Sequence, residues 1–401
     1  EFMEKVKNNE EFDLISPRDG EITGQLMARE VFEQMVQLAW KTGDPGIVFL
    51  DRINRDNPNP QLGEIESTNP CGEQPLLPYE SCNLGSINLA RMVTYTDSDV
   101  LINWERLSRV TRTSVHLLDN VIDMNQYPIP EIAEMSRTTR RIGVGVMGWS
   151  DLLVELGIRY DSEEALDLAE AVMKHIQEET YKASEELVES RGTFPSWEGS
   201  AYNNASVTRK MRNSAPVTIA PTGTISIIAG ASSGIEPLFA LSYVRNVMDR
   251  TKLVEGNPYF EAIAKYEGFY SQELMEQLAA SGSLEHLDVP DWVKGLFRVS
   301  HDIDPEWHVR MQAAFQKHTD NSVSKTINFS HDATESDVYQ AYMLAYETNC
   351  KGITVYRDGS KSEQVLSTGD TNKHSDGSVN ISEIPFYRVP RERPREIRGV
   401  T

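Results

Sequence analysis

Apolar runs and amphipathic stretches alternate along most of this chain. The run at 141–148 is apolar on both sides of the pleat and is interrupted by glycine, which is typical of a strand buried on both faces. Strands alternating with helices imply parallel strands joined by crossover helices, in an α/β sheet or barrel. The predicted strands are 82–89, 141–148, 214–221, 325–329 and 352–357. The predicted helices between them are 104–124, 128–139, 149–156, 162–190, 305–317 and 334–347.

The remaining segments predict three regions along the chain. We expect residues 1–63 to be a lead-in, residues 64–361 to hold the sheet, and residues 362–401 to be a flexible linker followed by a tail with five arginines. Within the lead-in, the pattern predicts the end of a helix at 1–10, a hairpin at 14–23, a helix at 28–42 and a short strand at 46–51. Residues 243–300 read as helical.

Composition narrows the class of protein. The chain has 401 residues, 39% of them hydrophobic, and can bury a large core. Its net charge of −22 argues against a nucleic-acid partner, because phosphate backbones need a cationic surface. We expect no membrane span, since no stretch of 18 apolar residues occurs, and no secretory signal, since the chain opens with charged residues. Three cysteines indicate a reducing compartment, and we expect the cytoplasm.

Reactive side chains gather in the run from Glu64 to Cys82. Its prolines and Gly72 exclude a helix, so the run is a loop or an irregular extended segment. In an extended chain, alternate side chains share a face, which would place Asn69, Cys71 and Glu73 side by side. A thiol between an amide and a carboxylate can act as a nucleophile or as a hydrogen-atom donor, and the spacing leaves both roles open.

The other cysteines and the histidines give no metal site. Cys350 precedes a predicted strand and is expected to be a packing residue. Three cysteines are too few for an all-cysteine zinc site. The histidines, among them His301, His308 and His318, do not have the spacing of metal ligands on a helix. We therefore predict no metal bound directly by this chain.

A second candidate site follows the third predicted strand, at Pro221, Thr222, Gly223, Thr224, Ile225 and Ser226. Gly223 allows close backbone approach, and the hydroxyls lie beside helix-start N–H groups, a combination that binds phosphate. Taken alone the signal is weak, since Ser and Thr at a helix start are usually caps. The next loop, 231–239, is expected to line the same pocket.

Three motifs together resemble the catalytic chain of ribonucleotide reductase, and the adenosylcobalamin-dependent (class II) form most closely. They are Asn-Pro-Cys-Gly-Glu-Gln-Pro-Leu, Ala-Pro-Thr-Gly-Thr-Ile-Ser and Lys-Gly-Ile-Thr-Val-Tyr-Arg-Asp-Gly-Ser, in that order. The likeness covers nearly all of residues 1–366. It implies a ten-stranded α/β barrel made of two five-stranded halves, with a central finger loop. This chain would carry the second half, with the finger loop at 64–81, and the first half and its allosteric site would lie upstream.

The resemblance also implies a role for each candidate residue. Cys71 resembles the cysteine that becomes a thiyl radical and removes the 3′ hydrogen of a ribonucleotide. Glu73 matches the general base for the 3′-OH, and Asn69 matches the amide that hydrogen-bonds the sugar. Cys82 resembles one of two cysteines whose oxidation to a disulfide supplies the reducing electrons. The segment Pro221–Ser226 matches the one that binds the substrate's phosphates.

The cofactor and the partners follow from the same likeness. The iron-dependent class I form passes a radical along a Tyr–Tyr pair, and the equivalent positions here read Ile353-Thr354-Val355. Adenosylcobalamin is therefore the expected cofactor, bound without a protein histidine, since no Asp-x-His-x-x-Gly motif occurs. The expected partners are a ribonucleotide, a chain carrying the first half-barrel and an external thioredoxin-like dithiol; a homodimer is left open.

Two other interpretations compete with reduction of ribonucleotides to deoxyribonucleotides for DNA synthesis. The chain could be a non-catalytic half-barrel that acts as an assembly module, or a class I large chain with a metal-bearing radical partner. The intact Asn69, Cys71 and Glu73 argue against the first, and the missing Tyr–Tyr pair argues against the second. The sequence does not decide between a di- and a triphosphate substrate.

Overall fold

The structure, a computed structural model, describes residues 1–97, 99–246 and 252–360. The predicted linker and arginine-rich tail at 362–401 lie outside these residues. Two compact units are present. The larger one holds Glu1–Phe239 and the described residues from Ser300 onward, and the smaller one holds the described residues of Ala240–Val299.

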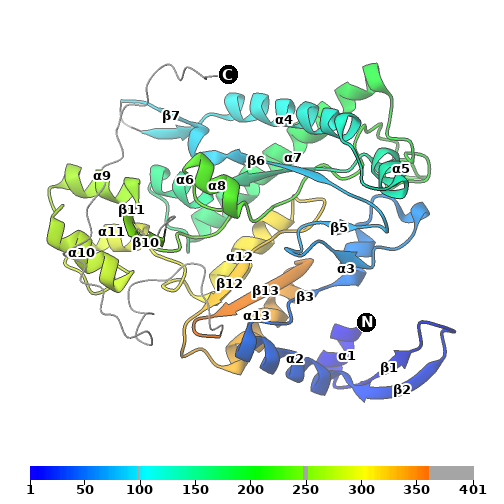
Figure 1. The fold of residues 1–401 in the computed structure, drawn as a ribbon, viewed down its shortest axis with the longest axis horizontal. Coiled ribbons are helices and arrows are strands. Elements are labelled where there is room, and N and C mark those ends of the chain that lie inside the picture. The colour runs from blue at the N-terminus through cyan, green and yellow to red at the C-terminus, as the bar shows by residue number, and fades with distance from the viewer. Residues whose placement is uncertain (98, 247–251, 361–401) are drawn as a thin grey trace. The chain divides into compact units, whose positions relative to one another are not determined.

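Parallel strands form the centre of the larger unit (Figure 1). Two parallel pairs are joined by residues 215–220, which make parallel bridges from Val217 to Val144 and from Ile219 to Val323. Five parallel segments therefore lie next to one another in chain order, which confirms the predicted alternation of strands and helices. The pairs are β6 (Asn83–Asn88) with β9 (Ile142–Met147), and β12 (Thr326–Phe329) with β13 (Gly352–Arg357).

The two edges of this parallel set differ. At one edge, β13 pairs antiparallel with the short strand β3 (Ile47–Val48) from the lead-in. At the other edge, β6 pairs with β9 alone among the strands that the structure describes. The five parallel strands are thus an open set, as expected for half of a barrel.

Helices connect the parallel strands and cover the sheet. Asn103 and Ser162 cap α4 and α7 by accepting hydrogen bonds from the backbone N–H groups of Arg106 and Ala165. Apolar side chains of α4, α6, α7 and α12 pack on β6 and β9, with Trp149 fully buried among them. The helices are α4 (Trp104–Met124), α5 (Pro130–Thr139), α6 (Trp149–Leu156), α7 (Glu163–Arg191), α8 (Gly223–Ala229), α12 (Pro305–Gln316) and α13 (Glu335–Glu347).

The lead-in has the predicted helix, hairpin and helix, but the strand predicted at 46–51 is limited to Ile47–Val48, and a helix that was not predicted begins at Leu50. The lead-in packs on α12, α13 and the last two parallel strands in a second apolar cluster. Its elements are α1 (Phe2–Asn8), β1 (Glu11–Ile15), β2 (Ile22–Met27), α2 (Ala28–Thr42) and α3 (Leu50–Arg55). Short elements that the hydrophobic pattern did not predict follow it. They are β4 (Ser67–Thr68), β5 (Pro75–Leu76), β7 (Val93–Tyr95), β8 (Val100–Ile102) and the 3₁₀ turns Pro60–Leu62 and Leu89–Arg91.

The smaller unit corrects one prediction. Residues 243–300 were expected to be helical, but the unit opens with an antiparallel hairpin. The sequences Tyr-Val-Arg-Asn and Lys-Leu-Val favour strands through their β-branched and aromatic residues, a signal too short to outweigh the helical stretch that follows. The unit comprises β10 (Ser242–Asn246), β11 (Lys252–Gly256), α9 (Pro258–Glu267), α10 (Gln272–Ser281) and α11 (Asp291–Leu296).

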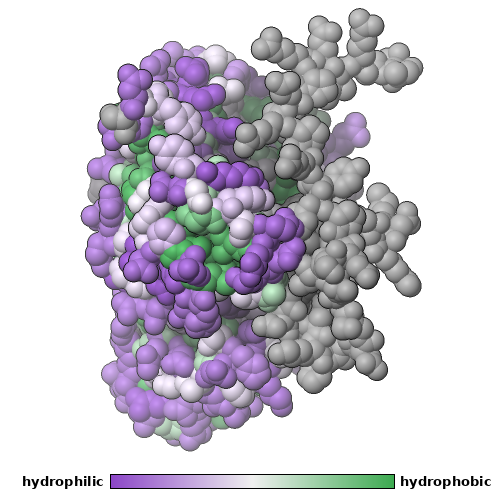
Figure 2. Space-filling model, turned by 90° about the vertical axis from the view of Figure 1, so that its left-hand side faces the viewer, coloured by the Kyte–Doolittle hydropathy of each residue, from purple (hydrophilic) through white to green (hydrophobic). Residues whose placement is uncertain are grey.

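The surface agrees with the acidic, polar composition. The face in Figure 2 is largely hydrophilic, with apolar residues gathered near its middle. No helix in the described part of the chain has the length and apolar character needed to cross a membrane.

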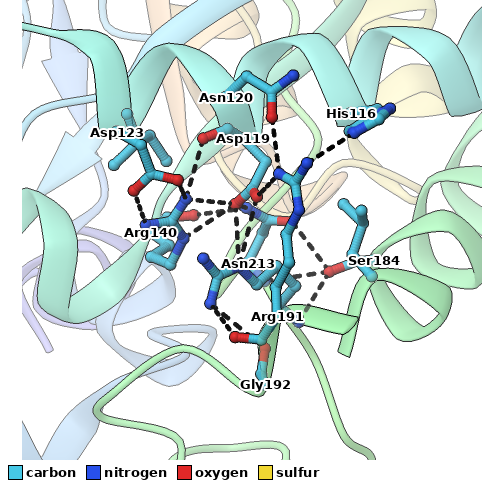
Figure 3. Close-up of polar contacts among 12 residues, drawn as sticks. His116, Asp119, Asn120, Asp123, Arg140, Ser184, Arg191, Gly192 and Asn213 are labelled. Carbon is cyan, nitrogen blue, oxygen red and sulfur yellow. Dashed lines mark hydrogen bonds and ion pairs between the residues drawn. The ribbon is translucent and has the colours of Figure 1, made fainter. Parts of the chain in front are cut away.

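A buried aspartate fixes the start of the third parallel segment (Figure 3). Asp119 on α4 is fully buried and accepts hydrogen bonds from Arg140 at 2.8 Å, Arg191 at 2.7 Å and Asn213 at 3.1 Å. Arg212 forms a further ion pair with it at 3.3 Å. Burial alone would raise the pKa of Asp119, but its hydrogen bonds and ion pairs with the arginines hold it below its usual range. The cluster therefore ties α4, α5 and α7 to the segment that leads to Pro221.

Candidate functional site

The finger loop is a short hairpin whose strands are β4 and β5. Asn69 closes its end: its N–H donates to the Gln74 carbonyl at 3.1 Å, and its Oδ1 accepts the Gln74 N–H at 3.0 Å. Gly72 makes the turn, with φ of 79° and an N–H bonded to the Asn69 carbonyl. The backbone at 70–73 therefore turns, so of the two predicted forms the loop is present, and the extended form with Asn69, Cys71 and Glu73 on one face is not. Side chains two residues apart point to the same face only in an extended strand.

The turn gives Cys71 and Glu73 different environments. Cys71 is exposed at the tip of the hairpin, whereas Glu73 is only 3% exposed. The Glu73 carbonyl accepts the Thr218 hydroxyl at 2.9 Å and the Ser322 N–H at 3.0 Å, which anchors the hairpin on the third and fourth parallel segments. Glu73 Oε2 is buried and has no hydrogen-bond partner among the residues that the structure describes. Buried acceptors are usually hydrogen-bonded, so this oxygen has capacity left for a donor that binds at the site.

The environment of Cys71 favours a protonated thiol. Partial burial, and then the negative charge of Glu73, raise the pKa of Cys71 above its usual range. A nucleophilic cysteine needs the opposite shift, toward thiolate. Of the two roles that spacing left open, the electrostatics therefore favour the S–H hydrogen-atom donor.

Glycines in β9 make room for the finger loop. A Cβ on Gly143 would lie 2.4 Å from the Leu84 side chain and 3.1 Å from Gln74 Nε2. A Cβ on Gly145 would lie 2.2 Å from the Thr218 carbonyl oxygen. The glycine-interrupted pattern of this strand thus reflects the close approach of the hairpin and the third segment.

Cys82 lies immediately before β6, close to a buried ion pair. Arg141 donates from Nε to Glu80 Oε1 at 2.9 Å and from Nη1 to Asn321 Oδ1 at 2.6 Å. Burial raises the pKa of Cys82 strongly, the charges of Glu80 and Glu73 add to that effect, and Arg141 opposes it. Sequence reasoning missed this pair, although an arginine at the start of an apolar strand was a visible signal.

The predicted phosphate segment is a turn followed by α8. Thr222 adopts the left-handed conformation, with φ of 54°, and α8 begins at Gly223. The geometry of a helix start leaves the N–H groups of Gly223, Thr224 and Ile225 without partners inside the helix. Thr224 and Ile225 are exposed, and Ser226 is buried. The segment thus offers backbone donors at its surface.

The loop 231–239 lies against this segment, as expected. Ser233 and Ser226 share a hydrogen bond of 2.9 Å between their hydroxyls, and the Gly234 N–H donates to Thr222 Oγ1 at 2.7 Å. Because Thr218 contacts Glu73 and leads directly into Pro221, one parallel segment connects the finger loop to the phosphate segment. The fold therefore brings the two predicted sites together.

Cys350 is fully buried in the second apolar cluster, and burial raises its pKa to about 11, as suits a packing residue. No group of three His, Cys, Asp or Glu side chains arranged to hold a metal ion occurs within the described ranges.

Known proteins resemble this chain over most of its length. A vitamin B12-dependent ribonucleoside-diphosphate reductase from Thermoplasma acidophilum is 51% identical over 96% of this chain, which covers 49% of that protein. One from Mycobacterium tuberculosis is 47% identical over 92% of this chain, which covers 52% of that protein. The chain thus spans about half the length of these curated relatives.

A solved structure supports the fold. The class Id ribonucleotide reductase alpha subunit of Actinobacillus ureae superposes with a TM-score of 0.69 at 25% identity, over 83% of this chain and 61% of that one. The family of the ribonucleotide reductase barrel domain matches residues 1–356. By this match, the chain belongs to the ribonucleotide reductase barrel-domain family.

Proposed function

We propose that this chain carries the catalytic half-barrel of an enzyme that reduces ribonucleotides to 2′-deoxyribonucleotides. The observation that carries the proposal is the exposed thiol of Cys71, with a pKa raised by partial burial and by Glu73, at the tip of a hairpin in which Glu73 itself is buried. As a thiyl radical, Cys71 takes the 3′ hydrogen of the ribose. The names of the B12-dependent relatives support the same reaction.

Glu73 and Asn69 interact with the sugar of the substrate. The unpartnered Glu73 Oε2 accepts the proton of the 3′-OH, which is general-base catalysis by a positioned carboxylate. Asn69 Oδ1 already accepts the Gln74 N–H, so the Asn69 side chain has its Nδ2 group to donate to the sugar. Cys82 provides one thiol of the pair that is oxidised to a disulfide as the substrate is reduced, and an external thioredoxin-like dithiol restores it.

The substrate's phosphates bind at Pro221–Ser226. The backbone donors at the start of α8 and the exposed Thr224 hydroxyl suit an anion, even on a chain with a net charge of −22. The names of the relatives favour a diphosphate.

Adenosylcobalamin fits the residues present and supplies the initiating radical when bound. On β13, Ile353 and Val355 are buried and Thr354 is exposed, so no aromatic pair stands there to relay a radical from another subunit. The exposed position of Cys71 allows a bulky cofactor to approach its thiol directly.

A chain carrying the first half-barrel is the proposed partner. The edge of β6 that faces away from β9 has no strand partner in the described part of this chain, and β13 already pairs antiparallel with β3. A second, oppositely running set of strands would complete the barrel.

The test combines the chain with a chain supplying the first half-barrel, adenosylcobalamin, a dithiol and a ribonucleotide. We expect deoxynucleotide only when all are present, and none with Cys71→Ser. Product without cobalamin would instead support a class I enzyme. No product under any condition, with a complex still formed, would support an assembly module.

A further inference from the structure

An ion pair between the buried Lys325 and the partly exposed Glu236 joins the loop 231–239 to the fourth parallel strand. Lys325, at the start of the fourth parallel strand, has a fully buried side chain, and its Nζ lies 2.6 Å from Glu236 Oε2. The other carboxylate oxygen, Glu236 Oε1, accepts the Thr326 N–H at 2.7 Å. Both oxygens of Glu236 are therefore held by the beginning of β12.

His308 completes the surroundings of Lys325. Its Nδ1 lies 3.1 Å from Lys325 Nζ and its Nε2 lies 3.1 Å from the Ser300 carbonyl. Because an ammonium group only donates, Nδ1 must accept and Nε2 must carry the hydrogen, so this histidine is neutral. Glu236 is thus the partner that balances the buried positive charge.

Side chains from other parts of the chain form hydrogen bonds with the backbone of the rest of the loop. Asp151 Oδ2 accepts the Ser232 N–H at 2.6 Å, and the Ser150 hydroxyl donates to the Glu236 carbonyl at 2.7 Å. The Tyr160 hydroxyl donates to the Ile235 carbonyl at 2.8 Å. Residues on both sides of Ser233 and Gly234 are therefore fixed to the α6 and α7 side of the fold.

Ser233 and Gly234 in turn contact the phosphate segment. Ser233 bonds the Ser226 hydroxyl, and the Gly234 N–H bonds the Thr222 hydroxyl. A Cβ on Gly234 would lie 2.9 Å from the Ala220 carbonyl oxygen, so the loop and the segment are in close contact. The loop therefore contacts Thr222 and Ser226 directly, and Glu236 is one of the residues that hold the loop in place.

We propose that Glu236 and Lys325 are a positioning pair that fixes the loop 231–239 against Pro221–Ser226 and thereby sets the affinity for the substrate's phosphates. This inference rests on the proposed function. Lys325 is fully buried and cannot touch substrate, so it acts through Glu236 and the loop. Phosphates do not react in the reduction, so the pair affects binding more than the chemical step.

The first experiment uses the completed barrel and the neutral double variant Lys325→Met with Glu236→Gln. The double variant leaves no buried charge unpaired, so it avoids the main reason for a single variant to unfold. We expect KM for a ribonucleoside diphosphate to rise about tenfold, with kcat changed less than about threefold. A merely structural pair would give a wild-type KM once neutrality is restored, and that result would overturn the proposal. Lys317→Met, at an exposed lysine, is the matched control.

A second experiment needs no variant, no cobalamin and no turnover. Hydrogen exchange is measured on the full wild-type chain with and without inorganic pyrophosphate, and with an unphosphorylated nucleoside as a comparison. We expect pyrophosphate, and not the nucleoside, to slow exchange at the amides of Gly234 and Thr326, which donate within the contacts described above. Unchanged exchange at both amides would contradict the coupling.

The two proposals can fail separately. Slowed exchange without deoxynucleotide formation would retain the positioning pair and reject the reductase. Deoxynucleotide formation with a wild-type KM in the double variant would retain the reductase and reject the positioning pair. Cys71→Ser should abolish reduction and leave the response to pyrophosphate unchanged.

Discussion

At the scale of single residues, the environment of Cys71 determines its chemistry. Hydrogen-atom transfer needs a neutral S–H, and partial burial together with the charge of Glu73 favours that form. A turn, rather than an extended strand, produces the arrangement, so Glu73 is buried while the thiol stays exposed. Partial burial and the charge of this carboxylate together raise the pKa of the thiol.

Replacing Glu73 should make Cys71 more reactive as a nucleophile. In Glu73→Gln the negative charge is lost, the thiol's pKa falls, and alkylation of Cys71 by iodoacetamide at pH 7.5 should become faster. Mass spectrometry of the Cys71 peptide measures the rate. Glu66→Gln, at an exposed position of the same loop, should leave the rate unchanged. An unchanged or slower rate in Glu73→Gln would contradict the assigned influence of this carboxylate.

Removing the buried charge of Asp119 should lower the stability of the fold more than removing a partly exposed charge from the same helix, α4. Asp119→Asn leaves Arg140, Arg191 and Arg212 without their shared buried partner and should lower the free energy of unfolding by about 3–5 kcal/mol. Asp123→Asn, at a half-exposed position that also pairs with Arg140, should cost about 1 kcal/mol or less. Urea denaturation measures both values, and equal losses would show that the buried cluster has no special weight.

At the scale of elements, the hydrophobic pattern predicted a parallel strand most clearly where a short apolar run lies between helices, as at Ile142–Met147. Residues 215–220 take the predicted place but form isolated bridges and no regular strand. Pro216 and Pro221 lack the N–H needed for a ladder. The hairpin at 242–256 was missed because its strand signal is brief.

The residues of the candidate site also differ in how far the sequence alone could predict them. Asn69, Cys71 and Glu73 could be selected from the sequence because they are close along the chain, but the turn that gives Cys71 and Glu73 different environments could not be predicted. Glu236 and Lys325 are 89 residues apart, and only the parallel strands bring them together. Contacts of this kind depend on the tertiary fold and have no signature in spacing.

The close packing of β9 can be tested by adding one methyl group. In Gly145→Ala the new Cβ would approach the Thr218 carbonyl to 2.2 Å, and overpacking of this kind costs about 1–3 kcal/mol. Gly85→Ala on the adjacent strand meets Leu118 at an ordinary 3.5 Å and is the matched control. In thermal unfolding, Gly145→Ala should unfold at a lower temperature than Gly85→Ala. Equal stability of the two variants would refute the close approach.

At the scale of the whole molecule, stability should fall in mild acid. Burial, followed by the charge of Lys325, holds the pKa of His308 well below its usual value. The unfolded chain, with an ordinary histidine pKa of about 6.5, therefore binds more protons than the folded chain below that pH. Stability present above pH 6.5 is lost as the pH falls toward the folded-state pKa.

Unfolding curves between pH 7.5 and 5 measure this loss. His308→Gln keeps an acceptor for Lys325 and a donor for Ser300 but cannot titrate, so its stability should depend less on pH over this range. His318→Gln is the control at a half-buried histidine whose pKa is also lowered, and it should keep most of the wild-type dependence. Identical pH profiles for wild type and His308→Gln would contradict the assignment.

The central claim is that Cys71 removes the 3′ hydrogen of a ribonucleotide. The most direct measurement compares the reduction of a 3′-deuterated and an ordinary ribonucleotide by the completed barrel with adenosylcobalamin and a dithiol, in wild type, Cys71→Ala and Cys350→Ala. We predict slower reduction of the deuterated substrate by wild type and by Cys350→Ala, and no deoxynucleotide from Cys71→Ala. Deoxynucleotide formed by Cys71→Ala would contradict the claim.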